Sequence, residues 1–315
     1  MLLTYASSAR LVKPRFVLPH HRLSSRAPLT LRVMSTFNLV QTSPPIPVRL
    51  PPNLSQEQLL SFPAFRSWLS TLQESLQLQQ EPSHPLHEAP YKLRSIEVQS
   101  CDYFGGQRLG FIKLKAEVTN DRGESLPGAV FMRGGSVAML LILQPEDATG
   151  SSSSGDQEEY AVLVVQPRIA AGSLGFVEIP AGMLDDGGTF AGVAAREIKE
   201  ETGLEIAADE LVDMTALTIQ SRNSDQSSDE AHLQQALYPS PGGCDEFIPI
   251  FLARKKIKRD EMNEMKGRLT GLRDHGEKIT LKICRLAELW KVGVRDGKTL
   301  AAVALYEGLK REKKL

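Results

Sequence analysis

Residues 182–204 read GMLDDGGTFAGVAAREIKEETGL, and this stretch decides how the whole chain is interpreted. It carries three carboxylates within five positions, Glu197, Glu200 and Glu201. Arg196 directly precedes them. In a helix these carboxylates stand at i, i+3 and i+4 and share one face. Like charges so close repel one another, whereas a hard divalent cation neutralises them and prefers oxygen ligands. The stretch therefore predicts a helix that carries a metal site.

The same residues resemble the Nudix box, whose pattern is G-x5-E-x7-R-E-U-x-E-E-x-G-U with U an aliphatic residue. The fixed positions that match are Gly182, Arg196, Glu197, Ile198, Glu200, Glu201, Gly203 and Leu204. Gly188 stands where the pattern has a glutamate, which in the family chiefly supports the box arginine and sometimes contacts metal. Asp185 or Asp186 is the candidate substitute for that glutamate.

The resemblance implies a magnesium site, with manganese as the alternative ion. By resemblance the backbone oxygen of Ala181 joins Glu197 and Glu201 as ligands, and Glu200 bridges a further ion. Arg196 is expected to form an ion pair with a box carboxylate and to hold that carboxylate in its orientation. Cations of this kind screen the oxygens of a diphosphate and lower the pKa of an attacking water. The implied chemistry is metal-dependent hydrolysis of a diphosphate.

A general base is expected on a loop beyond the box. In the branch of the family that cleaves nucleoside diphosphate sugars, a glutamate there takes a water proton or binds metal. The stretch GLRDHGEKI at residues 271–279 resembles that loop and makes Glu277 the expected base. His275, which titrates near neutral pH, is the first alternative, and Asp274 is the second.

Three features around the box resemble the ADP-sugar branch: Arg168, EIPAG at residues 178–182 and SPGGCDE at residues 240–246. They imply that Arg168 and Glu178 face the nucleotide or the diphosphate and that Glu246 lies near the site. For Glu178 the alternative is a structural ion pair with a neighbouring arginine. Arg133, in a Gly-rich turn, is another candidate diphosphate contact, with an ordinary turn residue as the alternative.

Within that branch the resemblance is closest to plant ADP-sugar diphosphatases of plastids. It implies hydrolysis of an ADP-sugar, ADP-glucose ahead of ADP-ribose, to AMP and sugar 1-phosphate. The enzymatic alternatives are UDP-glucose and dinucleoside polyphosphates. A ligand sensor that keeps the fold without turnover is the non-enzymatic alternative, and Gly188 favours it. The resemblance also implies a homodimer formed through the β-rich amino-terminal region, here residues 91–130.

Composition places the chain among ordinary soluble globular proteins. It has 315 residues, of which 41% are hydrophobic and 24% charged, and a net charge of −1. This charge argues against a protein that binds nucleic acid by neutralising phosphates. Cys101, Cys244 and Cys284 are isolated, so neither a disulfide framework nor a zinc site is predicted. No apolar run approaches the roughly 20 residues that cross a bilayer, and no membrane span is expected.

The amino terminus has the composition of an organelle transit peptide. Residues 1–56 contain no Asp or Glu. Basic residues recur there among serines and leucines, at Arg10, Lys13, Arg15, Arg22, Arg26, Arg32 and Arg49. We therefore assign residues 1–50 to a transit peptide and a Pro-rich linker, with a disordered basic tail as the alternative. The chloroplast is the expected compartment and the mitochondrion the alternative.

The remaining chain is predicted to form two regions. Residues 51–133 contain a helical segment at 54–76, with a capping box at Ser55 and a break at Pro63, and then a β-rich region. Residues 134–315 form the Nudix domain. Its expected strands are residues 137–143, 160–165, 211–218, 247–253 and 278–284, and its closing helices are residues 286–290 and 299–310. This order matches an α/β/α sandwich with a mixed sheet, the fold that the resemblance implies.

Overall fold

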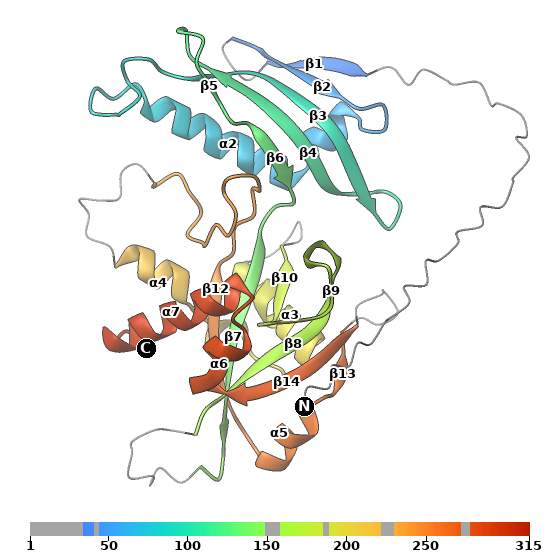
Figure 1. The fold of residues 1–315 in the computed structure, drawn as a ribbon, viewed down its shortest axis with the longest axis vertical. Coiled ribbons are helices and arrows are strands. Elements are labelled where there is room, and N and C mark those ends of the chain that lie inside the picture. Colours follow the sequence, from blue (N-terminus) through green and yellow to red (C-terminus); the bar gives the residue numbers. More distant parts are fainter. Residues whose placement is uncertain (1–33, 41–43, 149–157, 185–188, 222–229, 272–277) are drawn as a thin grey trace, which may run out of the picture. The chain divides into compact units, whose positions relative to one another are not determined.

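The computed structural model describes residues 34–40, 44–148, 158–184, 189–221, 230–271 and 278–315. Residues Met34–Leu315 form one compact unit. It contains two sheets, a six-stranded sheet formed by the first part of the unit and an eight-stranded sheet formed by the rest (Figure 1).

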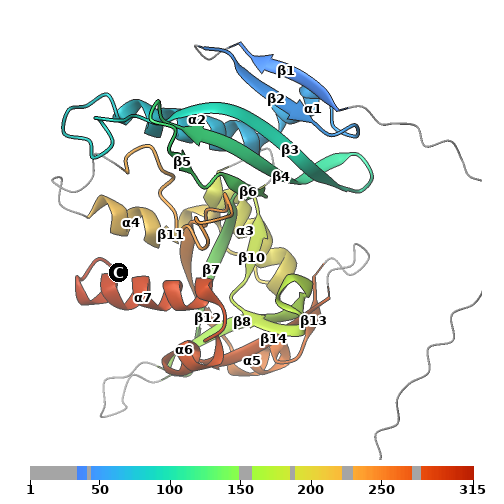
Figure 2. The ribbon, with the colours of Figure 1, turned by 45° about the horizontal axis from the view of Figure 1, so that its top comes forward.

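The amino-terminal sheet has the strand order β1-β2-β3-β4-β5, with β6 paired to β4. Its strands are β1 (Ser35–Leu39), β2 (Ile46–Leu50), β3 (Lys92–Phe104), β4 (Arg108–Thr119), β5 (Ser125–Leu126) and β6 (Ala129–Met132). Buried and exposed residues alternate along β2 and β4, as expected for strands of a sheet with one solvent-exposed face. Helix α2 (Pro63–Leu78) runs along the other face, where Phe65 and Leu69 join the core (Figure 2).

The predicted break in the helical segment is confirmed. Helix α1 (Gln56–Ser61) ends one residue before Phe62, and α2 begins with Pro63 at its first position. The Ser55 hydroxyl accepts the Gln58 backbone N–H at 3.1 Å, and the Gln58 side chain accepts the Ser55 backbone N–H at 3.0 Å. Proline lacks the N–H that would continue α1, so it starts a new helix instead.

The linker expected before residue 50 is a wrong prediction. β1 and β2 pair in antiparallel fashion, and β2 pairs in parallel with β3 through Val48 and Ile96. Ile46, Val48 and Leu50 all point into the core. This short alternation gives the segment a sheet face, although its basic and Pro-rich composition suggested a linker.

The second sheet has the order β11-β12-β7-β8-β14-β13, with β10 on β7 and β9 on β8. Its strands are β7 (Ser136–Pro145), β8 (Tyr160–Arg168), β9 (Ser173–Glu178), β10 (Ala181–Met183), β11 (Val212–Asp213), β12 (Ile250–Ile257), β13 (Leu269–Thr270) and β14 (Ile279–Arg285). β12 pairs in parallel with β7, and the other pairs are antiparallel. The sheet is therefore mixed, as predicted.

Helices cover both faces of this sheet. On one face α3 (Phe190–Thr202) and α5 (Arg259–Met265) pack on alternate residues of β7 such as Met139 and Leu141. On the other face α4 (Met214–Gln220), α6 (Leu289–Val292) and α7 (Gly297–Arg311) pack on Leu140 and Ile142. Figure 1 shows α7 in front of β12. The predicted α/β/α sandwich is thus confirmed.

The strand expected over residues 211–218 is a wrong prediction. Only Val212 and Asp213 pair with β12, and α4 follows immediately. The Asp213 carboxylate accepts the Ala216 backbone N–H at 2.9 Å and the Thr215 hydroxyl at 2.6 Å. An aspartate at a helix N-cap satisfies a backbone donor that would otherwise lack a partner, and this outweighs the strand preference of the apolar residues that follow.

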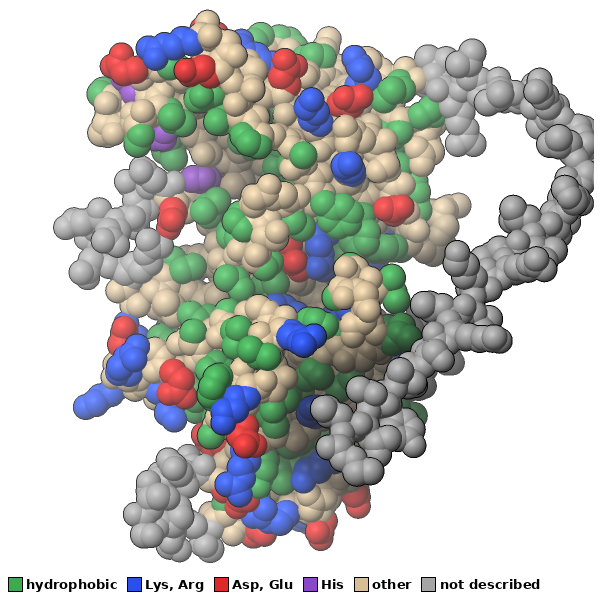
Figure 3. Space-filling view, viewed as in Figure 1, with side chains coloured by type: hydrophobic (Ala, Val, Ile, Leu, Met, Phe, Trp, Pro, Cys, Tyr) green, Lys and Arg blue, Asp and Glu red, His purple; other side chains and the backbone are tan. Residues whose placement is uncertain are grey.

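Charges of both signs are interspersed over the face of the molecule shown in Figure 3. In the described part of the chain, no helix has the length and the apolar character that crossing a membrane requires.

Candidate active site

The predicted box begins in a tight turn between β9 and β10 that two other elements hold in place. The Ile179 backbone N–H donates to Thr299 Oγ1 at 3.2 Å and lies 3.4 Å from Asp296 Oδ2, both at the start of α7. The Pro180 carbonyl accepts the Met139 backbone N–H of β7 at 2.9 Å. Because backbone groups of the turn are hydrogen-bonded both to α7 and to β7, the conformation of the turn is fixed.

Helix α3 spans the stretch that was predicted to be helical. The Thr189 hydroxyl caps its start by accepting the Gly192 backbone N–H at 3.1 Å. Gly203 ends it in the left-handed conformation with φ 75°. Because α3 packs on β7 and β10, its acidic face reaches the turn.

Glu197 contacts the turn at Gly182. A Cβ atom added at position 182 would lie 2.0 Å from Glu197 Cδ and 2.3 Å from its Oε2. Real Cβ atoms do not approach other atoms so closely, so a side chain at position 182 would displace the Glu197 carboxylate. Glycine at this position allows the turn and the Glu197 side chain of α3 to approach each other closely.

Glu201 contacts the same turn one helical turn further along α3. Its side chain is buried, and Oε2 accepts the Ala181 backbone N–H at 3.1 Å. Burial raises the pKa of Glu201 well above its usual range, and the charge of Glu197 raises it further. The hydrogen bond from Ala181 opposes this rise, and the positive charge of Arg168 does so more weakly. A buried carboxylate beside a second carboxylate is costly unless a positive charge neutralises it.

The donor set at the turn fits a hard divalent cation, since it consists of carboxylate oxygens next to backbone. Glu197 and Glu201 provide the side chains, while Glu200 is half-buried and Arg196 is exposed on α3. Across residues 34–315, outside the gaps given above, no three His, Cys, Asp or Glu side chains form a group arranged to hold an ion. The structure thus brings two of the three predicted carboxylates to the turn backbone.

Arg168 and Glu178 form an ion pair at the end of β9. Arg168 Nε lies 2.6 Å from Glu178 Oε1, and Lys298 Nζ lies 2.8 Å from Glu178 Oε2. Glu178 is 2% exposed, whereas the Arg168 side chain is 41% exposed. This is the ion-paired arrangement that was the alternative for Glu178, and it leaves Arg168 as the accessible member of the pair.

Arg133 and Glu246 also pair with each other. The two side chains form an ion pair, and the Ser136 hydroxyl donates to the same Glu246 oxygen at 2.9 Å. Asp245 accepts the backbone N–H groups of Arg133 at 2.7 Å and of Gly134 at 3.2 Å. The predicted SPGGCDE loop therefore folds onto the turn between β6 and β7 and fixes its conformation.

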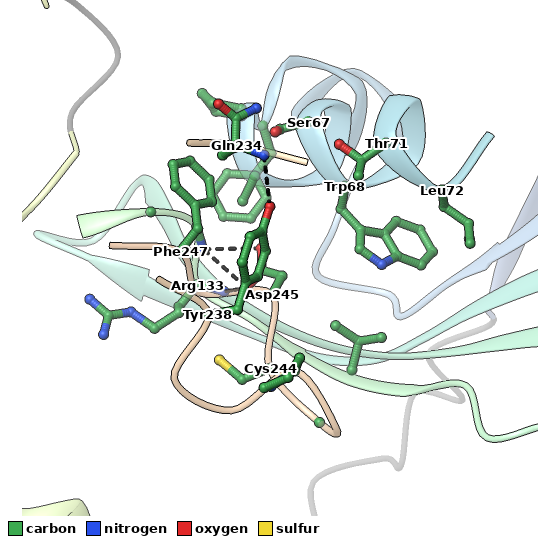
Figure 4. Close-up of a pocket in the computed structure, with 18 of the residues that line it drawn as sticks. Ser67, Trp68, Thr71, Leu72, Arg133, Gln234, Tyr238, Cys244, Asp245 and Phe247 are labelled. Atoms are coloured by element: carbon green, nitrogen blue, oxygen red, sulfur yellow. Dashed lines mark hydrogen bonds between the residues drawn. The ribbon is translucent and has the colours of Figure 1, made fainter. Parts of the chain in front are cut away.

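A cavity of about 790 Å³ lies between α2, the end of β6 and this loop. Trp68 and Leu72 line it from α2, and Tyr238 and Phe247 line it from the loop. In Figure 4 the two loop rings stand side by side, while the guanidinium of Arg133 points away from the cavity. The lining is mostly apolar and aromatic, a character typical of small-molecule sites.

Several predicted residues lie outside the described residues. These are the general base candidates Asp274, His275 and Glu277, and Asp185, Asp186 and Gly188 of the box.

Sequence reasoning missed three residues that the structure places at the site, Asp296, Lys298 and Asp245. An aspartate before the helical run of residues 297–311 is a usual N-cap signal, and it identifies Asp296. Nothing near Lys298 in the sequence points to Glu178, which is 120 residues away.

A family model and a related protein agree on the type of domain. A model of the NUDIX domain matches residues 152–302. Nudix hydrolase 14, chloroplastic, of Arabidopsis thaliana is 36% identical over 250 residues, which cover 79% of this chain and 71% of that protein. A solved structure described as an ADP compounds hydrolase aligns with 71% of this chain and 99% of its own, at 16% identity and a TM-score of 0.40.

Proposed function

From the premise that this chain belongs to the Nudix hydrolase family, we propose that it hydrolyses the diphosphate of an ADP-sugar, ADP-glucose ahead of ADP-ribose, to AMP and sugar 1-phosphate. The observation that carries the proposal is the turn of residues 178–182. Two carboxylates of α3 contact it, and the accessible guanidinium of Arg168 is anchored at its first residue. A diphosphate requires such groups, carboxylates to hold a cation and an arginine to bind phosphate. The motifs EIPAG and SPGGCDE support the choice of an ADP-sugar.

Nudix hydrolases generally use divalent metal ions. In this chain we propose Mg²⁺, with Mn²⁺ as a substitute. Glu197, Glu201 and the Ala181 carbonyl would hold the ion, and Glu200 would bridge a second one. A bound ion screens the diphosphate oxygens and lowers the pKa of an attacking water.

The other residues have supporting or proton-transfer roles in this proposal. Arg196 orients a carboxylate of the box, and Arg168 binds the diphosphate. Glu277 accepts the proton of the attacking water, with His275 and Asp274 as the alternative bases. Because Glu178 is buried in its ion pairs, its role becomes that of an anchor for Arg168.

The cavity beside Trp68 is the proposed place for the nucleoside. Met183 and Leu184 line it, and they directly follow Gly182. Two residues span at most about 7 Å, which is within the reach of one nucleotide. The rings of Trp68, Tyr238 and Phe247 offer faces on which a base stacks. Arg133, which also lines the cavity, and its ion-pair partner Glu246 complete the proposed substrate-binding residues.

The plastid is the proposed location, with the mitochondrion as the alternative. The acid-free composition of residues 1–56 supports a transit peptide, and the Arabidopsis relative is named as chloroplastic. We further propose a homodimer formed through residues 91–130. A monomeric mass in solution at micromolar concentration would reject the homodimer.

The test of the proposed reaction is product analysis with the full chain and Mg²⁺ in ¹⁸O-labelled water. The substrates are ADP-glucose, ADP-ribose, UDP-glucose and a dinucleoside polyphosphate. We expect ADP-glucose to give AMP and glucose 1-phosphate fastest, with activity lost on chelation. The label then identifies which phosphorus is attacked. Faster cleavage of UDP-glucose or of the dinucleoside polyphosphate would overturn the substrate assignment. No hydrolysis of any of them with Mg²⁺ or Mn²⁺ would favour the ligand sensor.

A further inference from the structure

The first turn of α7 contains a lysine in an unusual place. Lys298 is the second residue of the helix, and its side chain is only 16% exposed. A positive charge is disfavoured both by the dipole at a helix amino terminus and by burial. Its Nζ atom lies 2.8 Å from Asp296 Oδ1 and 2.8 Å from Glu178 Oε2. Burial alone would lower the pKa of Lys298, but these two carboxylates raise it above its ordinary value. The ammonium is therefore kept charged between them.

Glu178 is shared between two cations. Lys298 takes its Oε2 atom, and Arg168 takes its Oε1 atom through Nε. An arginine and a carboxylate that meet without a competitor commonly form two parallel hydrogen bonds. Here the second carboxylate oxygen is already occupied, so Arg168 is held by a single bond.

This single bond has a consequence for the rest of the guanidinium. Within the described residues, the terminal nitrogens of Arg168 make no hydrogen bond to the protein. The Arg168 side chain is 41% exposed. Both terminal nitrogens therefore keep their donors for a ligand, and a guanidinium with two such donors can bind adjacent oxygens of a diphosphate.

We propose that Lys298 is a positioning residue: by occupying the second oxygen of Glu178, it keeps both terminal nitrogens of Arg168 available for the diphosphate of the substrate. This inference rests on the proposed function, because it assigns Arg168 to that ligand. Without Lys298, Arg168 would turn onto Glu178 and form the two-bond pair, and its terminal nitrogens would leave the substrate site.

The test is a double-mutant cycle in the full chain with Lys298→Met and Arg168→Ala, measured with ADP-glucose and Mg²⁺. Loss of a charge-assisted contact predicts that Lys298→Met raises KM about 10-fold, while kcat changes less than about threefold. In the Arg168→Ala background the same substitution should change KM less than about twofold, because the residue through which Lys298 acts is gone. Lys314→Met is the matched control, since it removes an exposed lysine 2.7 Å from Glu312, and its KM should equal that of the wild type.

A merely structural role would give a different pattern. Lys298→Met would then raise KM by the same factor with and without Arg168, and this result would overturn the inference. An unchanged KM in the single variant would overturn it as well. If Lys298→Met does not fold, Lys298→Gln removes the charge with a polar side chain of similar length, and the same pattern is expected.

Binding of an ADP analogue with a methylene group between its phosphorus atoms separates this inference from the proposed function. If no nucleotide sugar is hydrolysed, the proposed function fails, and calorimetry with the analogue still tests Lys298. About 10-fold weaker binding to Lys298→Met, abolished in the Arg168→Ala background, supports the positioning role. Equal binding to the wild type and Lys298→Met rejects it.

Discussion

The two sheets of this protein bury different kinds of polar group. In the amino-terminal sheet and its helices, the buried polar side chains of the described residues are the amides Gln79 and Asn120. In the second sheet and its helices they include the carboxylates Glu178, Glu201 and Asp296. Burying a neutral amide costs little once it is hydrogen-bonded, whereas a buried charge requires a partner of opposite sign. The difference indicates that the first region buries polar groups only as part of its packing, whereas the second buries charged groups that need a partner.

The amides of the first region are satisfied within the fold. The Gln79 side chain donates to the carbonyls of Leu76 and Tyr91 and accepts the Tyr91 backbone N–H at 2.7 Å. It therefore ties the end of α2 to the start of β3. By contrast, Glu201 has a backbone donor as its hydrogen-bond partner and a second carboxylate as its neighbour. A carboxylate in that state would be stabilised by a nearby positive charge.

The largest expected effect lies in the packing region and concerns stability. Phe65 is fully buried in the core between α2 and the amino-terminal sheet. Phe65→Ala should lower the free energy of unfolding by about 3–5 kcal/mol, because it removes buried contacts and leaves a cavity. Chemical denaturation measures this loss, and kcat per folded molecule should stay unchanged.

Trp68→Ala is the matched control for Phe65→Ala. Trp68 lies three residues along the same helix but lines the cavity. Its loss should raise KM for ADP-glucose by about 5- to 100-fold through lost stacking, with a smaller loss of stability. If Phe65→Ala lowers kcat of the folded enzyme while Trp68→Ala leaves KM unchanged, the distinction between a packing residue and a cavity-lining residue of α2 is wrong.

The next effect concerns chemistry in the second region. Glu201→Gln removes a buried negative charge and should lower kcat/KM by about 100- to 1000-fold, without loss of the fold. Steady-state kinetics and circular dichroism measure the two outcomes. Glu205→Gln serves as the control, because Glu205 is exposed and pairs with Lys199 at the surface. Full activity in Glu201→Gln would mean that the buried carboxylate has a purely structural role.

A smaller effect is expected from filling the space at Gly182. Gly182→Ala places a methyl group against Glu197 and should displace that carboxylate. We expect kcat/KM to fall about 10- to 100-fold, with apparent Mg²⁺ affinity reduced in a titration of activity. Gly308→Ala in α7 meets no atom within 4 Å and should be neutral or slightly stabilising. If both variants behave alike, the approach of Glu197 to the turn has no importance for activity.

The smallest effect is expected at a partly exposed ion pair of the second region. The hydrogen bond from Arg259 lowers the pKa of Glu158 to about 2, and the Tyr160 hydroxyl adds to this. A lowered pKa in the folded state stabilises the protein above the unfolded value near 4.5, and this stabilisation is lost as pH falls towards 2. Arg259→Gln should therefore lower Tm by about 1–2 °C at pH 7. Scans at several pH values should show the difference narrowing below pH 4.5; a difference that widens there would contradict this assignment.

The sequence predicted the parts of the molecule that depend on local spacing. Three acidic positions at i, i+3 and i+4 identified the helix α3. Ser55 and Pro63 identified the boundaries of α1 and α2. Such features need only a few neighbouring residues, so a single sequence contains them.

What the sequence did not reveal depends on partners far along the chain or on competing local signals. Ile46 and Val48 form a strand only because β3 offers them an edge, and basic composition concealed the pattern. Residues 211–218 have strand-like side chains, but the cap at Asp213 starts a helix. The predicted roles of Glu200 and Arg196 stay predictions.

The hydrogen bonds of Ile179 make its amide proton a reporter of the whole site. Its partners Thr299 and Asp296 stand 120 and 117 residues later, in the first turn of α7. The same turn carries Lys298, which holds Glu178. Exchange of this amide with solvent deuterium requires that turn to open, and opening removes Lys298 from Glu178, so that Arg168 can then pair with both oxygens of Glu178. Fraying of this helical turn and the change in how Glu178 holds Arg168 are therefore a single thermodynamic event.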